Sequence, residues 1–131
     1  MKKYTNRKEY LSKLLAYKDK DLIKVVSGLR RSGKSTLFEL YRETLLQMGV
    51  QANQIVFLNF EDFELRKFLN DLDALYAHII GQLNLSKPCY VFLDEVQNVN
   101  EFERLVDGLF VKSNLDVYIT GSNAFLLSGE L

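Results

Sequence analysis

The chain has 131 residues, the length of one domain, and 47% of them are apolar, which is enough for a hydrophobic core. It carries 17 basic and 17 acidic residues, but residues 1–42 hold 12 of the basic and only 4 of the acidic ones. A solvated basic helix explains most of this asymmetry, so it gives no indication of nucleic acid as a partner. Neither a signal-peptide core nor a run of membrane-spanning length occurs, and we expect a cytoplasmic protein without a membrane contact.

The single cysteine, Cys89, has no second cysteine and no cluster of histidines with which to form a disulfide or a zinc site. We therefore expect Cys89 to be a buried structural thiol. His78, the only histidine, lies within a predicted helix and is also expected to be structural.

Short apolar runs alternate along the chain with segments that have helical spacing. The continuous runs, which indicate strands buried on both faces, cover residues 22–27, 55–58, 90–93 and 117–120. Helices are predicted for residues 6–17, 37–48, 69–83 and 102–110, where apolar residues recur every three or four positions. In the second helix the predicted apolar face consists of Leu37, Leu40, Tyr41, Thr44, Leu45 and Met48, and Gly49 is placed to end it. Asn70 or Asp71 is available to cap the third helix.

Strands that alternate with helices predict an α/β fold, with a parallel sheet and helices on both of its faces. In such a sheet ligands bind beyond the carboxyl ends of the strands, so the residues that follow each run are the candidates for function.

Residues 28–36, Gly-Leu-Arg-Arg-Ser-Gly-Lys-Ser-Thr, match the phosphate-binding loop pattern G-x-x-x-x-G-K-[ST] (Walker A) at every fixed position. The glycines allow consecutive backbone N–H groups to converge on phosphate oxygens. Lys34 supplies a charge between the β- and γ-phosphates, and Ser35 supplies a hydroxyl to Mg²⁺. The predicted nucleotide-binding residues are Gly28, Arg30, Arg31, Ser32, Gly33, Lys34, Ser35 and Thr36.

The third apolar run leads directly into Asp94 and Glu95, which gives it the form of a Walker B strand. Asp94 is expected to hold Mg²⁺ with Ser35, and Glu95 to activate the water that attacks the γ-phosphate. One further strand and two helices separate Lys34 from Asp94, which favours the additional-strand class of P-loop ATPases over GTPases. The guanine motif N-K-x-D is also absent from the sequence.

The other two strand ends carry uncharged polar residues with two interpretations each. Asn123, in Ile119-Thr-Gly-Ser-Asn123, is placed to contact the γ-phosphate or the attacking water, or belongs only to a turn. Asn59 either donates a hydrogen bond to Glu95 and holds it away from water, or satisfies local backbone groups, which is the commoner role of an isolated asparagine.

These motifs, in this order and spacing, make the whole chain resemble the AAA-type ATPases of prokaryotes. More narrowly, it resembles the group in which the ATPase domain precedes a C-terminal domain of unknown function. The resemblance implies a three-layer αβα sandwich of the additional-strand class, with the phosphate-loop strand beside the sensor strand. It also implies that Asn123 is the sensor-1 residue and Asn59 a glutamate switch, so the implied catalytic residues are Glu95, Lys34, Asn123 and Asn59.

The resemblance divides the chain into an N-terminal helical segment, residues 1–20, and a βα core, residues 21–131, that runs through the sensor strand. Family members continue with a fifth strand, a helical lid and the C-terminal domain. We therefore expect this fold to be incomplete at its C-terminus, and a homo-oligomer, the C-terminal domain or a partner protein to cover the sheet edge.

ATP binding with Mg²⁺-dependent hydrolysis is the favoured function. The alternative is an interaction module that binds ATP and changes shape with little or no turnover; a small-molecule kinase is a weaker third, because no acceptor pocket is indicated. Hydrolysis is expected to be very slow. Arg30 and Arg31 occupy variable loop positions, and Arg104 is placed to serve only a neighbouring subunit, while an arginine finger contributes about 10³ to 10⁵ in rate.

Overall fold

Four parallel strands form the single sheet of the computed structural model, which describes residues 11–20, 22–26 and 31–121, with residues 31–36 as backbone only. The strands are β1 (Lys24–Val26), β2 (Ile55–Asn59), β3 (Cys89–Asp94) and β4 (Leu115–Thr120). Their spatial order is β1-β4-β3-β2, and every neighbouring pair is parallel. The expected α/β class is confirmed, and the phosphate-loop strand β1 lies beside β4, as the family resemblance implied.

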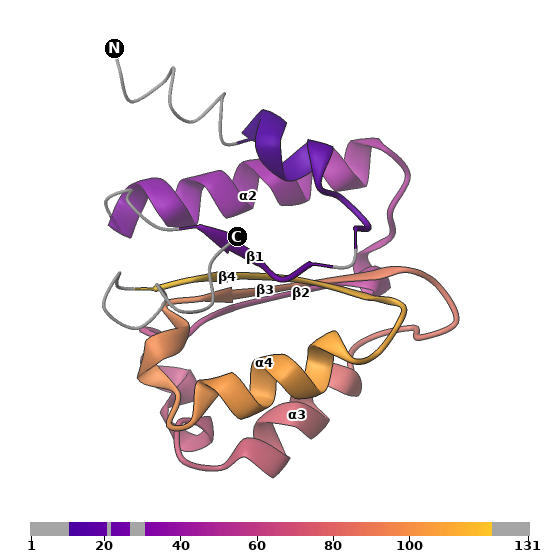
Figure 1. Ribbon diagram of the computed structural model, residues 1–131. Coiled ribbons are helices and arrows are strands. Elements are labelled where there is room, and N and C mark those ends of the chain that lie inside the picture. The colour runs from indigo at the N-terminus through magenta and orange to yellow at the C-terminus, as the bar shows by residue number, and fades with distance from the viewer. Residues whose placement is uncertain (1–10, 21, 27–30, 122–131) are drawn as a thin grey trace.

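Helices cover both faces of the sheet (Figure 1). Helix α2 (Arg31–Gln47) and the helical residues 11–16 lie on one face, and α3 (Leu72–Ile80) and α4 (Phe102–Phe110) lie on the other. The three-layer sandwich is therefore also confirmed.

The two central strands are buried along their whole length, and their side chains alternate between two cores. In β3, Val91 and Leu93 belong to the core under α3 and α4, whereas Tyr90 and Phe92 belong to the core under α2. Because successive side chains of a strand point to opposite faces, Asp94 and Thr120 fall on the face that α2 covers. Helix α2, which covers this face, begins within the phosphate-loop motif.

Helix α2 buries a narrower stripe than the predicted one. Leu37, Phe38, Tyr41 and Leu45 are fully buried, but the side chains of Leu40 and Met48 are 42% and 57% exposed. The prediction for Leu40 and Met48 was therefore wrong. At about 100° per residue, Leu40 lies outside the arc that these four buried residues span, and Met48 follows Gln47, the last residue of the helix. The predicted end is confirmed, since Gly49 has a φ of +100° just after the last helical turn.

The third helix is shorter than its apolar pattern. The structure divides that region into a 3₁₀ segment, η2 (Phe63–Phe68), and α3, which is capped by Asp71, whose side chain accepts a hydrogen bond from Ala74 N at 3.0 Å. The other 3₁₀ segments are η1 (Ala52–Gln54) and η3 (Val96–Asn98). Cys89 is fully buried, and burial raises the pKa of its thiol, which agrees with a structural role. His78 stacks on Phe68, with ring centroids 4.7 Å apart.

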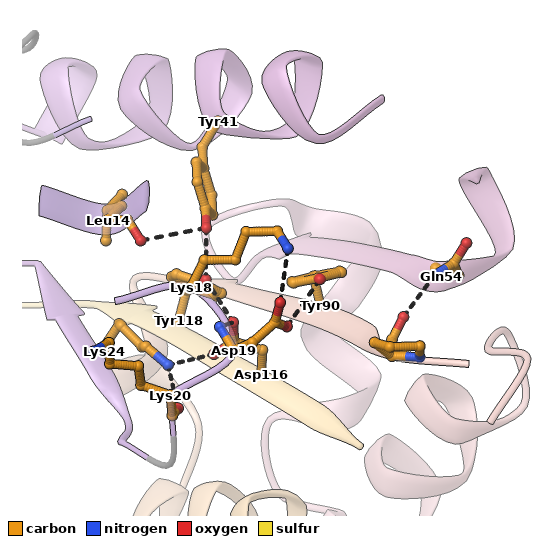
Figure 2. A network of polar contacts seen from close by, with 11 residues as sticks. Leu14, Lys18, Asp19, Lys20, Lys24, Tyr41, Gln54, Tyr90, Asp116 and Tyr118 are labelled. Atoms are coloured by element: carbon orange, nitrogen blue, oxygen red, sulfur yellow. Dashed lines mark hydrogen bonds and ion pairs between the residues drawn. The ribbon is translucent and has the colours of Figure 1, made fainter. Parts of the chain in front are cut away.

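A buried ion pair joins β1 to β4 at the amino ends of the strands. Lys24 Nζ lies 2.6 Å from Asp116 Oδ1 and also donates to Lys20 O, and both side chains of the pair are almost completely buried (Figure 2). Asp116 Oδ2 accepts hydrogen bonds from Asp19 N at 2.8 Å and from the Tyr118 hydroxyl at 2.7 Å. The pair therefore fixes the connector before β1 against the sheet.

Two tyrosines extend this network toward α2. The hydroxyls of Tyr118 and Tyr41 are 2.8 Å apart, and Tyr41 OH donates to Leu14 O in the N-terminal helical residues. Burial raises the pKa of both phenols, and the negative charge of Asp116 raises the pKa of Tyr118 further. Both therefore stay neutral hydrogen-bonding groups inside the core.

Candidate functional site

The carboxyl ends of all four strands meet at one level of the sheet. Val26 is in register with Thr120, and Asn59 is in register with Asp94. The pair Leu93 and Ile119 precedes Asp94 and Thr120 in the ladder between the central strands. In the sequence the phosphate-loop motif follows β1, and β4 alone separates β1 from the strand that carries Asp94.

A single hydroxyl links the two acidic residues at the end of β3. Thr120 Oγ1 donates to Asp94 Oδ1 at 2.5 Å and accepts from the backbone N–H of Glu95 at 2.9 Å. Asp94 and Thr120 are fully buried, and Glu95 is 4% exposed. Strand β4 therefore contacts both residues through one side chain, that of Thr120.

Glu95 begins a tight turn directly after the strand. Its backbone is left-handed, with φ 57° and ψ 48°, a conformation that costs a residue with a side chain about 1–2 kcal/mol. The turn continues into η3, where Gln97 Nε2 donates to Glu95 Oε1 at 3.0 Å. The Glu95 carboxylate is thus held by a side chain of its own turn.

Asn59 makes the local contact that was one of its two interpretations. Its Oδ1 accepts a hydrogen bond from Glu61 N at 2.9 Å. The end of β2 is joined to β3 and the turn after it by other groups: Phe60 N donates to Asp94 O at 2.9 Å, and Asn98 Nδ2 donates to Phe60 O at 3.4 Å. The role of Asn59 as a glutamate switch stays a prediction.

Several of the predicted site residues lie outside the described part of the chain. Gly28 and Arg30 fall in the gap between Val26 and Arg31, and Asn123 follows the last described residue, Gly121. Arg31, Ser32, Gly33, Lys34, Ser35 and Thr36 are described as backbone and form the first turns of α2. The helix thus begins within the phosphate-loop motif, at the edge of the sheet where β1 ends.

Arg104, the candidate for a neighbouring subunit, lies in the first part of α4. Its Nη1 is 3.2 Å from Glu101 Oε1, and the side chain is 78% exposed. An exposed pair of this kind contributes about 0–1 kcal/mol, so it leaves the guanidinium able to exchange partners.

The donor set at the end of β3 suits Mg²⁺. The ion prefers oxygen ligands and keeps several waters, so one buried carboxylate such as Asp94 is a sufficient protein anchor beside nucleotide phosphates. Within the described residues no group of three or more His, Cys, Asp or Glu side chains forms a metal site by itself. A metal at this position would therefore depend on nucleotide phosphates for the remainder of its ligands.

Two side chains of this site, Thr120 and Gln97, were missed by the sequence reasoning. The role of Thr120 could have been predicted, because the parallel register places the end of β4 next to the last residue of β3. The role of Gln97 could hardly have been predicted, because a turn allows many orientations of a glutamine side chain.

Comparison with known proteins gives one family and two relatives. A family model described as "AAA domain" matches residues 20–131. A protein of Haemophilus influenzae described as "Uncharacterized protein" is 44% identical over 127 residues, which are 96% of this chain and 32% of that protein. An uncharacterized protein of Methanocaldococcus jannaschii is 28% identical over 127 residues, 95% of this chain and 26% of that protein.

The chain therefore spans about a third and about a quarter of these relatives. No solved structure gives a significant match. Across the described ranges, no helix is both long and apolar enough to cross a membrane.

Proposed function

The chain belongs to the AAA domain family, and from this premise we propose that it binds ATP with Mg²⁺ and hydrolyses the γ-phosphate. The observation that carries the proposal is the placement of Asp94 and Glu95. Both are buried at the end of β3 and tied to β4, beside the strand from which the phosphate-loop motif leads into α2.

In this mechanism each residue acts on the part of the nucleotide or water that lies nearest to it. The backbone N–H groups of the loop and of the first turn of α2 bind the phosphates, and Lys34 neutralises charge between the β- and γ-phosphates. Ser35 and Asp94 anchor Mg²⁺, which supplies electrostatic stabilisation of the transferred phosphoryl group. Glu95 accepts a proton from the attacking water, and Asn123 contacts the γ-phosphate or that water.

Binding is tested first, by titration of the protein with MgATP and with ATP in the presence of EDTA. Lys34→Ala removes a charged hydrogen bond and is expected to weaken binding by about 1.5–3 kcal/mol. Lys87→Ala is the matched control, because Lys87 is exposed just before β3, at the amino edge of the sheet, and its Nζ contacts Gln51 Oε1 at 3.1 Å. Equal affinity of folded Lys34→Ala and parent protein would contradict the phosphate-loop assignment.

Hydrolysis is tested next, under single-turnover conditions with protein in excess over ATP, because turnover is expected to be slow. Glu95→Gln should bind ATP but not cleave it, since the amide cannot take a proton from water. Asp94→Asn should instead reduce the dependence of ATP binding on Mg²⁺. Binding without any cleavage by the parent protein would favour the nucleotide-dependent interaction module.

A further inference from the structure

The side-chain amide of Gln97 has one end hydrogen-bonded and the other end buried without a partner. Its Nε2 donates to Glu95 Oε1 at 3.0 Å. Its Oε1 is buried and, within the described part of the chain, is the only buried side-chain nitrogen or oxygen atom without a hydrogen-bond partner. Buried polar atoms are almost always paired, so such an atom calls for an explanation.

The chemistry of the two side chains fixes the orientation of the amide. An ionised carboxylate only accepts hydrogen bonds, so Gln97 must turn its NH₂ group toward Glu95 and its oxygen away. The opposite orientation would set two oxygens against each other. The unpaired Oε1 is therefore the consequence of directing the donor at Glu95.

The unpaired Oε1 costs stability, since an apolar side chain of similar length would leave no unpaired acceptor. The neighbouring contacts support a role at Glu95. Thr120 holds the backbone N–H of Glu95, and the left-handed φ of 57° sets the direction of the turn. Both of these contacts act on the backbone of Glu95, whereas Gln97 contacts its carboxylate.

We propose that Gln97 is a positioning residue that holds the Glu95 carboxylate toward the attacking water. This inference rests on the proposed function, in which Glu95 is the general base. Asn59 Oδ1 accepts a hydrogen bond from Glu61 N. Gln97, two residues after Glu95, donates directly to the Glu95 carboxylate and is therefore placed to direct it.

The test uses Gln97→Met, which keeps the length and apolar stem but removes both the donor and the unpaired acceptor. The matched control is Gln82→Met, because Gln82 Nε2 donates to His78 O at 2.9 Å at an exposed site at the end of α3. Three quantities are measured for each protein: the dissociation constant for MgATP, the single-turnover rate and the melting temperature.

Gln97→Met is expected to lower the single-turnover rate by about ten- to a hundredfold, the effect of a misdirected catalytic group. Its affinity for MgATP should stay within twofold, and its melting temperature should be unchanged or higher. Adding Gln97→Met to Glu95→Gln should lower the residual rate no further, because Gln97 acts on the reaction only through Glu95. Gln82→Met should match the parent rate.

Two results would overturn the inference while leaving the proposed function intact. One is a parent-like rate of Gln97→Met when Glu95→Gln has lost activity. The other is a lower melting temperature together with weaker MgATP binding, which would mark a purely structural role. If Glu95→Gln cleaves ATP as fast as the parent, or the parent cleaves none, the proposed function itself fails and the inference falls with it.

A second measurement does not depend on turnover. In ¹⁵N–¹H spectra the side-chain amide protons of Gln97 should exchange with solvent more slowly than those of exposed Gln82, and Glu95→Ala should remove that protection. Equal exchange at Gln97 and Gln82 in the parent protein would overturn the contact on which the inference is built.

Discussion

The buried pair of Lys24 and Asp116 allows a quantitative test of what holds the phosphate-loop strand in the sheet. The charged atoms are 2.6 Å apart, and the two side chains are 0% and 5% exposed. At an effective dielectric constant of about 20, two unit charges at this distance attract by about 6 kcal/mol. Much of that attraction offsets the cost of removing both charges from water.

Lys24→Met removes one partner and leaves Asp116 charged in the core, with only Asp19 N–H and the Tyr118 hydroxyl as donors. Loss of one member of a buried pair costs about 3–5 kcal/mol. A domain of this size has a total stability of about 5–15 kcal/mol, so the variant should fold but melt about 10–20 °C lower.

The assay is urea unfolding followed by circular dichroism and by tyrosine fluorescence, which is usable because the chain has no tryptophan. Lys18→Met is the matched control: Lys18 also pairs with an aspartate, Asp19, at 2.7 Å, but these side chains are 21% and 48% exposed. That pair should contribute about 0–1 kcal/mol.

The double variant Lys24→Met/Asp116→Asn should recover part of the loss, because it leaves no buried charge while the amide oxygen still accepts from Tyr118. The reasoning is refuted if Lys24→Met is no less stable than Lys18→Met, or if the double variant is less stable than Lys24→Met alone.

Two further predictions concern the hydroxyl groups on the same face of the sheet. Thr120→Val leaves the buried N–H of Glu95 without its acceptor, so it should lower the free energy of unfolding by about 1–3 kcal/mol and raise the Mg²⁺ concentration needed for ATP binding. Thr120→Ser keeps the hydroxyl and should stay near the parent in a Mg²⁺ titration. Equal behaviour of the two variants would disprove the role of the Thr120 hydroxyl. Burial raises the pKa of Tyr41 and Tyr118 above the usual 10.0, so the folded chain keeps protons that the unfolded chain releases. Stability from these groups is therefore complete below pH 10 and is lost as the pH rises above it, by up to about 1.4 kcal/mol per pH unit for each tyrosine. Urea unfolding between pH 9 and 11.5 should show this slope reduced in Tyr41→Phe, and an unchanged slope would count against the pKa shifts.

The order of elements could be read from the sequence because the signals for them are local. Continuous apolar runs mark β3 and β4, both of which are buried along their whole length, and Gly49 marks the end of α2. The placement of Asp94 and Glu95 at a strand end also followed from the sequence, since it depends only on where the apolar run stops. The position of β1 beside β4 was expected from the family resemblance, because adjacency in a parallel sheet is not a local property.

Side-chain partners were decided by the tertiary structure. Lys24 meets Asp116, and Thr120 meets Asp94, only because strand pairing brings together residues that are 92 and 26 positions apart in the sequence. The sequence offered only Asn59 as a partner of Glu95, whereas in the structure Gln97, in the turn after β3, donates to Glu95 Oε1. Sequence patterns report which face of an element is apolar, whereas the partner of a polar side chain depends on a register and a backbone direction that form only when the elements pack.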